Sequence, residues 1–225
     1  MYQVAKSIEY LKTVDHNNPM IDFPNPRLTT AEGLVAVGGN LKVETLVAAY
    51  SKGIFPWPQE GYPMLWFCPD PRGVLDFHDF HVPTSLKKFE KKHPNWKVTT
   101  NQAFPEVIRQ CRLQKRPGQS GTWISKEIQA AYIKFFEAGF VLSLEVWDGD
   151  ELIGGIYGVL LKGLFSGESM FYKRDNASKI AFWKIVEHLK SLGHQWMDIQ
   201  MVTSVTKAFG GKYIPREEFL RRLGI

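Results

Sequence analysis

The sequence predicts an α+β fold in which helices flank a mixed, mostly antiparallel sheet. The first observation is a run of three apolar, strand-like segments between residues 141 and 171. The second is their close spacing: only Asp148-Gly149-Asp150 and Lys162-Gly163 separate them, and such short connections favour an antiparallel meander. The third is the order of elements, because segments with helical periodicity come before and after the meander.

A change of composition divides the chain into two predicted domains. Residues 54–73 are rich in proline and aromatic residues, and proline excludes a long helix or a central strand from such a stretch. We therefore expect a small N-terminal α/β domain, residues 1–70, and a main domain, residues 71–225. Within the first, residues 1–20 are only weakly patterned.

The individual elements follow from local patterns. In the first domain an apolar run stops at Gly38-Gly39, and Asn40 is placed to cap a helix that ends at Gly53. Pro215 is expected to start a last short helix, where its missing N–H is harmless. The main-domain predictions are helices over Thr84–Lys92, Ala103–Gln114, Lys126–Glu137 and Ala177–Leu192, strands over 141–147, 151–161 and 163–171, and a further strand within His194–Val202.

Composition limits the classes of function. The chain has 225 residues, of which 44% are hydrophobic and 23% charged, as is typical of a folded globular protein. A formal net charge of +5 is compatible with a polyanionic partner and does not require one. Cys68 and Cys111 form no CxxC pattern, and the sequence shows no signal-peptide or membrane-span pattern. We expect a reduced, cytoplasmic protein that does not enter membranes.

Several well-known catalytic motifs are missing from the sequence. It contains no Walker A motif, no GxGxxG after a strand, no HExxH and no GxSxG, and its histidines lack metal-ligand spacing. We therefore expect no metal and no cofactor. Any catalysis would then rest on carboxylate, amide and hydroxyl groups.

Two polar residues in an apolar strand are the first candidates. In "HQWMDIQMV" a period of two places Asp198 and Gln200 on one face and Met197 on the other, and both faces look buried. A buried carboxylate and a buried carboxamide need hydrogen-bond partners. Those partners belong either to the protein or to a substrate, and the pattern leaves both possibilities open.

A third polar residue, Glu168, lies in the strand-like "SGESMF". The same period places Ser166, Glu168 and Met170 on one face. A carboxylate between small residues in an apolar strand is either half of a structural ion pair or a group that faces a ligand site.

Basic and aromatic residues outside the strands point to a nucleic acid. The segment "SLKKFEKKHPNWK" places Lys87 and Lys91, and likewise Lys88 and Lys92, one helical turn apart. These lysines form either a solvated face or a patch that neutralises phosphates. A second basic cluster comprises Arg109, Arg112, Lys115 and Arg116, and Trp57 and Trp123 lie in loops, where an indole either stacks on a base or packs against the sheet.

Eight motifs together resemble a known family. "GLVAVGGNL", "AAYSKGIFPW", "LWFCPDPRGVL", "GTWI", "EVWDGDELIGGIYGV", "GESMF", "NASKIA" and "DIQ" stand in the order found in leucyl/phenylalanyl-tRNA–protein transferases, from Phe23 to Leu220. The resemblance implies a small N-terminal domain and an acetyltransferase-like (GNAT) catalytic domain. It also implies that Leu or Phe moves from Leu-tRNA or Phe-tRNA to an N-terminal Lys or Arg of a protein, creating an N-degron, in a protein we expect to be a monomer.

The resemblance also implies roles for single residues. Asp198 and Gln200 match the family's catalytic pair, and Glu168 lies in the same site. The lysines match a basic cluster that holds the tRNA acceptor stem, and the two tryptophans match residues near the tRNA 3′ end. The positions matching the family's apolar aminoacyl pocket are Ile156, Met170, Phe182, Ile185 and Met197.

The sequence differs from the family pattern at two places, and two other functions are possible alternatives. Val205 stands where the family often has His, and "WFCPDPR" replaces "WWSPDPR". An acyl-CoA N-acyltransferase would need a glycine-rich loop before Ala177, where the sequence reads "YKRDNASK". A non-catalytic RNA-binding module would leave Glu168, Asp198 and Gln200 without a role.

The implied reaction leaves two roles open for Gln200. In the first, the side-chain carbonyl of Gln200 contacts the attacking amine, and Asp198 orients and polarises Gln200 through intervening groups. In the second, the side-chain N–H of Gln200 stabilises the oxyanion and Asp198 is the base. Recognition of Lys or Arg needs a negative group, for which Glu168 is the candidate.

Overall fold

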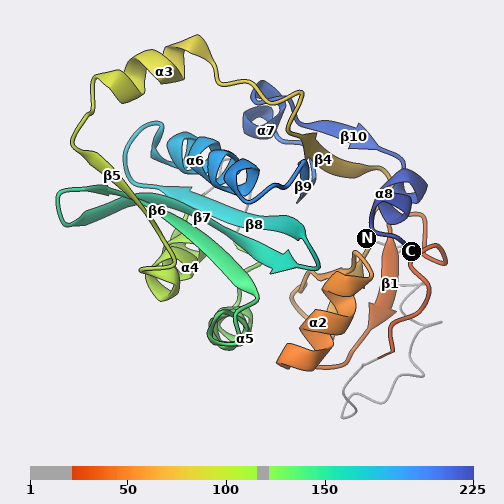
Figure 1. Ribbon diagram of the computed structural model, residues 1–225. Coiled ribbons are helices and arrows are strands. Elements are labelled where there is room, and N and C mark those ends of the chain that lie inside the picture. Colours follow the sequence, from red (N-terminus) through yellow and green to blue (C-terminus); the bar gives the residue numbers. More distant parts are fainter. Residues whose placement is uncertain (1–21, 116–121) are drawn as a thin grey trace. The chain divides into compact units, whose positions relative to one another are not determined.

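The computed structural model describes residues 22–115 and 122–225 (Figure 1). The predictions for residues 1–20 and for Arg116 fall outside this part of the chain. The chain divides into two compact units, each built from separate segments. The first holds the residues up to Arg72 together with Trp123–Ala131 and Ile214–Ile225, and the second holds Gly73–Thr122 and Tyr132–Tyr213. The boundary expected at residue 70 stays a prediction.

The first unit contains a three-stranded antiparallel sheet in the order β1 (Leu34–Val37), β3 (Leu65–Phe67), β2 (Phe55–Pro56). The expectation that residues 54–73 hold no central strand is wrong, because β3 lies between its two neighbours. The triplet that forms β3 contains no proline. Its Trp66 is fully buried and donates a 2.8 Å hydrogen bond from Nε1 to the carbonyl of Gly38.

Two helices of this unit begin slightly away from their predicted starts. Helix α2 is Val43–Ser51, with Lys42 as its N-cap, so Asn40 is not the capping residue. The side-chain oxygen Oδ1 of Asn40 accepts instead from the backbone N–H of Lys42 and from the hydroxyl of Thr45, both at 2.9 Å, and so fixes the chain before the helix. The last helix, α8 (Arg216–Arg222), has Pro215 at its N-cap.

A seven-stranded sheet carries the fold of the second unit. Its order is β10 (Lys212–Ile214), β4 (Arg72–Asp76), β9 (Trp196–Gln200), β8 (Leu164–Tyr172), β7 (Glu151–Leu161), β6 (Val141–Asp148), β5 (Trp96–Thr100). Strands β6, β7 and β8 form the predicted antiparallel meander, whereas β8 and β9 are parallel. The predicted α+β class, a mixed and mostly antiparallel sheet with helices, is confirmed.

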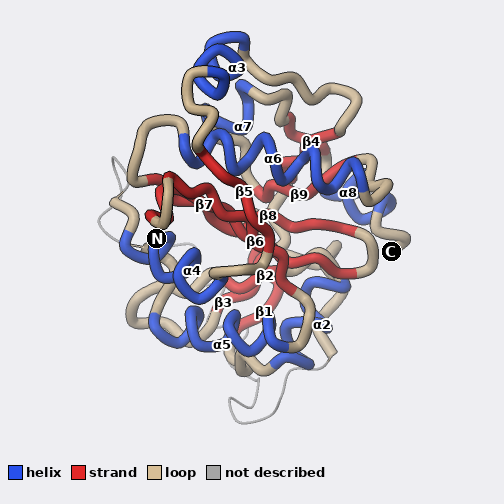
Figure 2. Tube along the Cα trace, turned by 60° about the vertical axis from the view of Figure 1, so that its left-hand side comes forward, coloured by secondary structure: helices blue, strands red, loops and turns tan. Residues whose placement is uncertain are grey.

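Four helices match the predicted ones within two residues: α3 (Thr84–Lys91), α4 (Phe104–Leu113), α5 (Lys126–Glu137), which has residues in both units, and α6 (Ala177–Ser191). A short helix that was not predicted, α7 (Ser204–Ala208), follows β9. Figures 1 and 2 show α6 on one side of strands β6 to β8 and α4 on the other. The main apolar core of this unit contains side chains of α6 and of β4, β6, β7, β8 and β9, so the strands that carry the candidate polar residues are anchored.

Candidate active site

Two β-bulges interrupt the strands that carry the candidate residues. Between β7 and β8, Tyr157 pairs with Ser169 but Gly158 pairs with Gly167, so Glu168 is an extra residue of β8. A bulge bends its strand and re-aims a side chain, so the simple alternation predicted for Glu168 does not hold.

The second bulge lies on β9. Val74 of β4 pairs with Asp198, whereas Gly73 pairs with Gln200, which leaves Ile199 as the extra residue. On the other side of β9, Asp198 pairs with Ser166 of β8. The two irregularities therefore occur on adjacent strands, close to their one paired position.

The backbone at Gln200 has an unusual conformation. Its φ of 57° lies in the left-handed region, which a residue with a side chain seldom occupies. The N–H of Met201 donates to the carbonyl of Ile199 at 2.5 Å, so Gln200 is the middle residue of a three-residue turn that ends β9. Residues held this way persist only where the surrounding structure fixes them, and they concentrate at functional sites.

Asp198 holds this turn directly. Its Oδ1 accepts a 2.9 Å hydrogen bond from the backbone N–H of Gln200, and Asp198 is completely buried. The expectation that Asp198 acts on Gln200 through intervening groups is therefore wrong. Parallel side chains at i and i+2 do not meet, but the turn brings the backbone N–H of Gln200 to the carboxylate.

Glu168 holds the side chain of the same residue. Nε2 of Gln200 donates a 2.9 Å hydrogen bond to Oε1 of Glu168, and Gln200 is 8% exposed. The Gln200 amide thus turns its NH₂ group, which can only donate, toward Glu168. The Gln200 carbonyl oxygen then faces away from Glu168. The hydrogen-bond partners of Gln200 seen here, Asp198 and Glu168, therefore belong to the protein and not to a substrate.

The five apolar residues assigned to the aminoacyl pocket belong to or pack against one core cluster. Ile156 of β7 pairs with Met170 of β8, Phe182 and Ile185 lie on α6, and Met197 lies on β9. Met170 is partly buried and the other four are buried. The methyl group of Met197 lies near Gly167, because a Cβ built on that glycine would be 3.4 Å from Met197 Cε. Met197 is thus close to the residue that precedes Glu168.

The four lysines lie on exposed positions of α3 and its C-cap. Lys87, Lys88 and Lys91 are on the helix and Lys92 follows it, while Leu86 is buried in the core. Glu90, the carboxylate among them, pairs instead with Lys184 of α6 at 2.8 Å. Within the described residues the four ammonium groups form no ion pair, so their charges remain uncompensated.

The second basic cluster is partly neutralised. Arg109 binds Glu106 through two hydrogen bonds of 2.7 Å, which raise the pKa of Arg109 and lower that of Glu106. This pairing makes α4 a weaker candidate for an anion site than α3.

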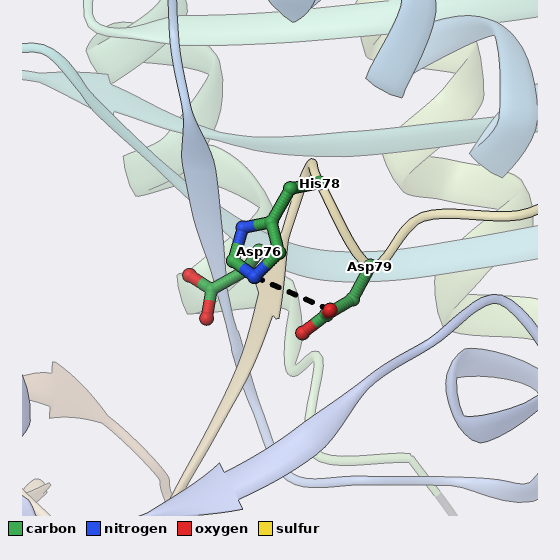
Figure 3. Close-up of side chains that lie close together, drawn as sticks. All are labelled: Asp76, His78 and Asp79. Carbon is green, nitrogen blue, oxygen red and sulfur yellow. Dashed lines mark ion pairs between the residues drawn. The ribbon is translucent and has the colours of Figure 1, made fainter.

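One group of side chains in the described part of the chain has the spacing of a metal site, which no pattern in the sequence indicated. Asp76 is the last residue of β4, His78 and Asp79 follow it, and Figure 3 shows the ion pair from His78 to Asp79. The ammonium of Lys212 lies 2.8 Å from Asp76 Oδ2 and 2.6 Å from Asp79 Oδ2. These hydrogen bonds raise the pKa of Lys212 and lower the pKa of Asp79. The Lys212 ammonium therefore already forms ion pairs with the carboxylates of both Asp76 and Asp79.

Comparison with known proteins identifies the family. Residues 74–224 match the family described as leucyl/phenylalanyl-tRNA protein transferase, and residues 39–70 match the N-terminal domain of the same family. The chain belongs to this family. The predicted resemblance is thereby confirmed, and as a leucyl/phenylalanyl-tRNA protein transferase the chain is an aminoacyltransferase that acts on aminoacyl-tRNA and a protein.

Relatives named leucyl/phenylalanyl-tRNA–protein transferase cover almost the whole chain. One from Anaeromyxobacter dehalogenans (strain 2CP-C) is 47% identical over 201 residues, which are 89% of this chain and 86% of the relative. One from Shewanella baltica (strain OS223) is 43% identical over 220 residues, 97% and 90% of the two chains. Among solved structures, a GCN5-related glucosamine N-acetyltransferase region of a fungal multi-domain enzyme has a TM-score of 0.46 at 10% identity, covering 65% of this chain and 20% of that one.

The remaining family positions are not on the two bulged strands. Val205, where the family often has His, is partly buried and packs against the main core, so it takes an apolar role. Trp57 and Trp123 belong to the first unit, whereas Glu168, Asp198 and Gln200 belong to the second. Trp57 lies among aromatic rings, 6.2 Å from Phe55 and 6.4 Å from Phe67 between centroids, and it is half-buried, like Trp123. Among the helices of residues 22–115 and 122–225, none combines the length and the apolar character that a membrane-spanning helix requires.

Proposed function

We propose that this transferase moves Leu or Phe from aminoacyl-tRNA to the α-amine of an N-terminal Lys or Arg, with Gln200 contacting the attacking amine. Asp198 holds the backbone of Gln200 and Glu168 holds its amide. The observation that carries this proposal is that Gln200 is held at two points, its backbone N–H by Asp198 and its side-chain NH₂ group by Glu168, through hydrogen bonds of 2.9 Å each. The enzyme acts as a cytoplasmic monomer without a metal or cofactor.

The reaction is the aminolysis of an ester. The amine nitrogen attacks the carbonyl carbon that joins the amino acid to the terminal adenosine, a C–N bond forms, and the C–O ester bond breaks. A free α-amine has a pKa of about 8 and is partly protonated at neutral pH, so attack requires its neutral form. The ester is already reactive, and the chief task left to the protein is to orient the amine.

The orientation of the Gln200 amide favours one of the two possible roles. With its NH₂ group on Glu168, the amide directs its carbonyl oxygen away from that carboxylate. This oxygen can accept an N–H of the attacking amine and align the nitrogen lone pair with the ester carbon. An amide oxygen is too weak a base to keep the proton, which passes to the adenosine oxygen as the ester bond breaks.

The rival role, in which Gln200 serves the oxyanion and Asp198 is the base, has less support. Asp198 is completely buried, and its Oδ1 already accepts the backbone N–H of Gln200. A general base must reach the proton that it removes. Asp198 is therefore better placed to hold the turn than to take a proton from a substrate.

The other predicted residues bind the two substrates. Met170, the partly exposed member of the apolar set, is where a Leu or Phe side chain would meet the core cluster, and a flexible thioether adapts to either shape. Trp57 and Trp123 would stack on the 3′ end of the tRNA. Lys87, Lys88, Lys91 and Lys92 would bind phosphates of the acceptor stem.

Transfer of radiolabelled Leu from Leu-tRNA to matched peptides tests the proposed function. We expect labelling of peptides with N-terminal Arg or Lys, and none of peptides with N-terminal Ala or acetylated Arg. Equal labelling of the Ala peptide would contradict the acceptor assignment. Full single-turnover activity in both Asp198→Asn and Gln200→Glu would contradict the assignment of the catalytic pair.

A further inference from the structure

Gly73 lies opposite Gln200, where β4 meets the bulge of β9. A Cβ built on Gly73 would lie 2.9 Å from the carbonyl carbon of Met201 and 3.0 Å from its Cα and its N. All three atoms belong to the backbone, so no side-chain rotation can relieve the crowding. Gly73 is not among the residues with positive φ. Glycine is therefore needed at this position because a side chain has no room, and not because the backbone conformation demands it.

Met201 is the residue that closes the turn around Gln200. Its N–H donates to the carbonyl of Ile199, and the crowded atoms include this same nitrogen. Any side chain at position 73 would push Met201 away from β4. That movement would open the turn and change the φ of 57° that Gln200 adopts.

We infer that Gly73 is a positioning residue for aminoacyl transfer. By leaving room for the backbone of Met201, it lets the chain turn at Gln200 and direct the Gln200 amide to Glu168. This inference rests on the proposed role of Gln200. Gly73 itself contacts no substrate in this account, and its effect passes through the conformation of one neighbouring residue.

A glycine on the other side of β9 differs from Gly73 in this respect. A Cβ on Gly167 would meet Met197 Cε at 3.4 Å, which is an ordinary contact with the end of a flexible side chain. Gly154 of β7 offers a better comparison, because a Cβ there would lie 2.6 Å from Ala177 Cβ and 2.9 Å from its carbonyl carbon. Gly154→Ala therefore creates similar crowding at the start of α6, far along the sheet from the turn.

The test compares Gly73→Ala with Gly154→Ala by single-turnover transfer at saturating peptide, by the apparent affinity for Leu-tRNA and by thermal unfolding. Displacing a reacting group by about 1 Å can cost about 100-fold in rate, so we expect Gly73→Ala to slow transfer by roughly 10- to 100-fold with unchanged Leu-tRNA affinity. Gly154→Ala should lose thermal stability and keep its rate at a temperature where it is folded. A wild-type rate in Gly73→Ala, or equal rate losses in both variants, would overturn the inference.

Gln200→Ala, assayed in parallel, separates this inference from the proposed function. A wild-type rate in Gln200→Ala would overturn both. A slow Gln200→Ala with a wild-type rate in Gly73→Ala would overturn the inference alone. In the double variant we expect the rate of Gln200→Ala with no further loss, because both changes act on one group. Rate losses that multiply would show that Gly73 acts elsewhere and would overturn the inference.

If Gly73→Ala does not fold, Met201→Gly tests the same turn from its other side. Met201 is 43% exposed, so removal of its side chain leaves the core intact while the backbone next to Gln200 gains freedom. We expect slower transfer at unchanged Leu-tRNA affinity, and a smaller loss in Met201→Ala. Equal rates in Met201→Gly and wild type would contradict the inference.

Discussion

The side-chain amide of Gln200 donates a 2.9 Å hydrogen bond to Oε1 of Glu168, across parallel strands and a sequence separation of 32 residues. Each residue lies in or beside a β-bulge, Glu168 in that of β8 and Gln200 directly after that of β9. A regular sheet would keep both side chains in strict alternation. The bulges instead bring a carboxylate to the amide that we propose contacts the substrate amine.

Glu168 should matter through its ability to accept this hydrogen bond. Glu168→Gln keeps an acceptor oxygen but loses the charge, whereas Glu168→Ala loses both. A hydrogen bond to a charged group contributes about 1.5–3 kcal/mol, so Glu168→Ala should slow single-turnover transfer by roughly 10- to 100-fold, with Glu168→Gln between it and wild type. Glu151→Gln, which removes a carboxylate paired with Arg174 at the sheet's hairpin, is the matched control. A faster rate in Glu168→Ala than in Glu168→Gln would contradict this role.

The four lysines of α3 should determine how salt weakens tRNA binding. Each lysine that neutralises a phosphate releases a counterion, so each Lys→Gln change should lower the slope of log affinity against log salt by roughly one unit. The loss should be the same for Leu-tRNA and Phe-tRNA, because phosphate contacts carry no sequence information. Lys190→Gln, at an exposed position of α6, is the control and should leave the slope unchanged. An equal change in the control would mean that net charge alone is responsible.

Lys184 should fix the position of α3, the helix that carries the proposed tRNA-binding lysines, without binding tRNA itself. Burial disfavours its charged form, but hydrogen bonds to Glu90 and Glu187 outweigh burial and raise the pKa of Lys184. The pair with Glu90 joins α6 to α3. Lys184→Gln should therefore weaken tRNA binding and increase hydrogen exchange in α3, with no change in the salt slope.

The double variant Glu90→Gln/Lys184→Gln distinguishes this effect from one of charge. The double change removes one charge of each sign and still breaks the contact between the helices, so we expect it to remain weak in binding. Recovery of wild-type affinity in the double variant would show that the charge of Lys184, and not its contact, is what matters.

The contacts of Lys212 should make stability depend on pH in a defined window. Hydrogen bonding to Lys212 lowers the pKa of Asp79, so this contribution exists above the pKa of an unfolded Asp, about 4, and is lost as pH falls. The raised pKa of Lys212 means that its contribution persists up to a pH of about 10 and is lost above it. Lys212→Met should lower Tm by about 2–4 °C at pH 7 and by little at pH 3. Lys207 is an exposed lysine of α7, and for Lys207→Met the Tm difference from wild type should not change between pH 7 and pH 3.

Much of the fold could be predicted because its elements are long and periodic. Helix α5 has the predicted bounds, and the meander of β6, β7 and β8 was visible from apolar segments with short connections. Strands β3 and β10, with three residues each, are too short for a period to emerge. Strand β5 is at the edge of the sheet and carries exposed residues, so it lacks an apolar pattern.

The site was predictable in its residue types and not in its geometry. Asp198, Gln200 and Glu168 were noticeable as polar residues in apolar strands. Their direct contacts depend on bulges, which violate the period of two that the prediction assumed. Gly73 and Lys212 act on residues far away in the sequence, and no local pattern reports such a partner.

The most direct test of the account is the single-turnover rate of Leu transfer to an Arg-peptide by Gln200→Glu at saturating substrates. This change replaces the NH₂ group that Glu168 accepts with a second carboxylate oxygen, so the two side chains repel and the carbonyl loses its orientation. We expect a rate about 100-fold below wild type with Leu-tRNA affinity preserved. A rate equal to wild type would contradict it.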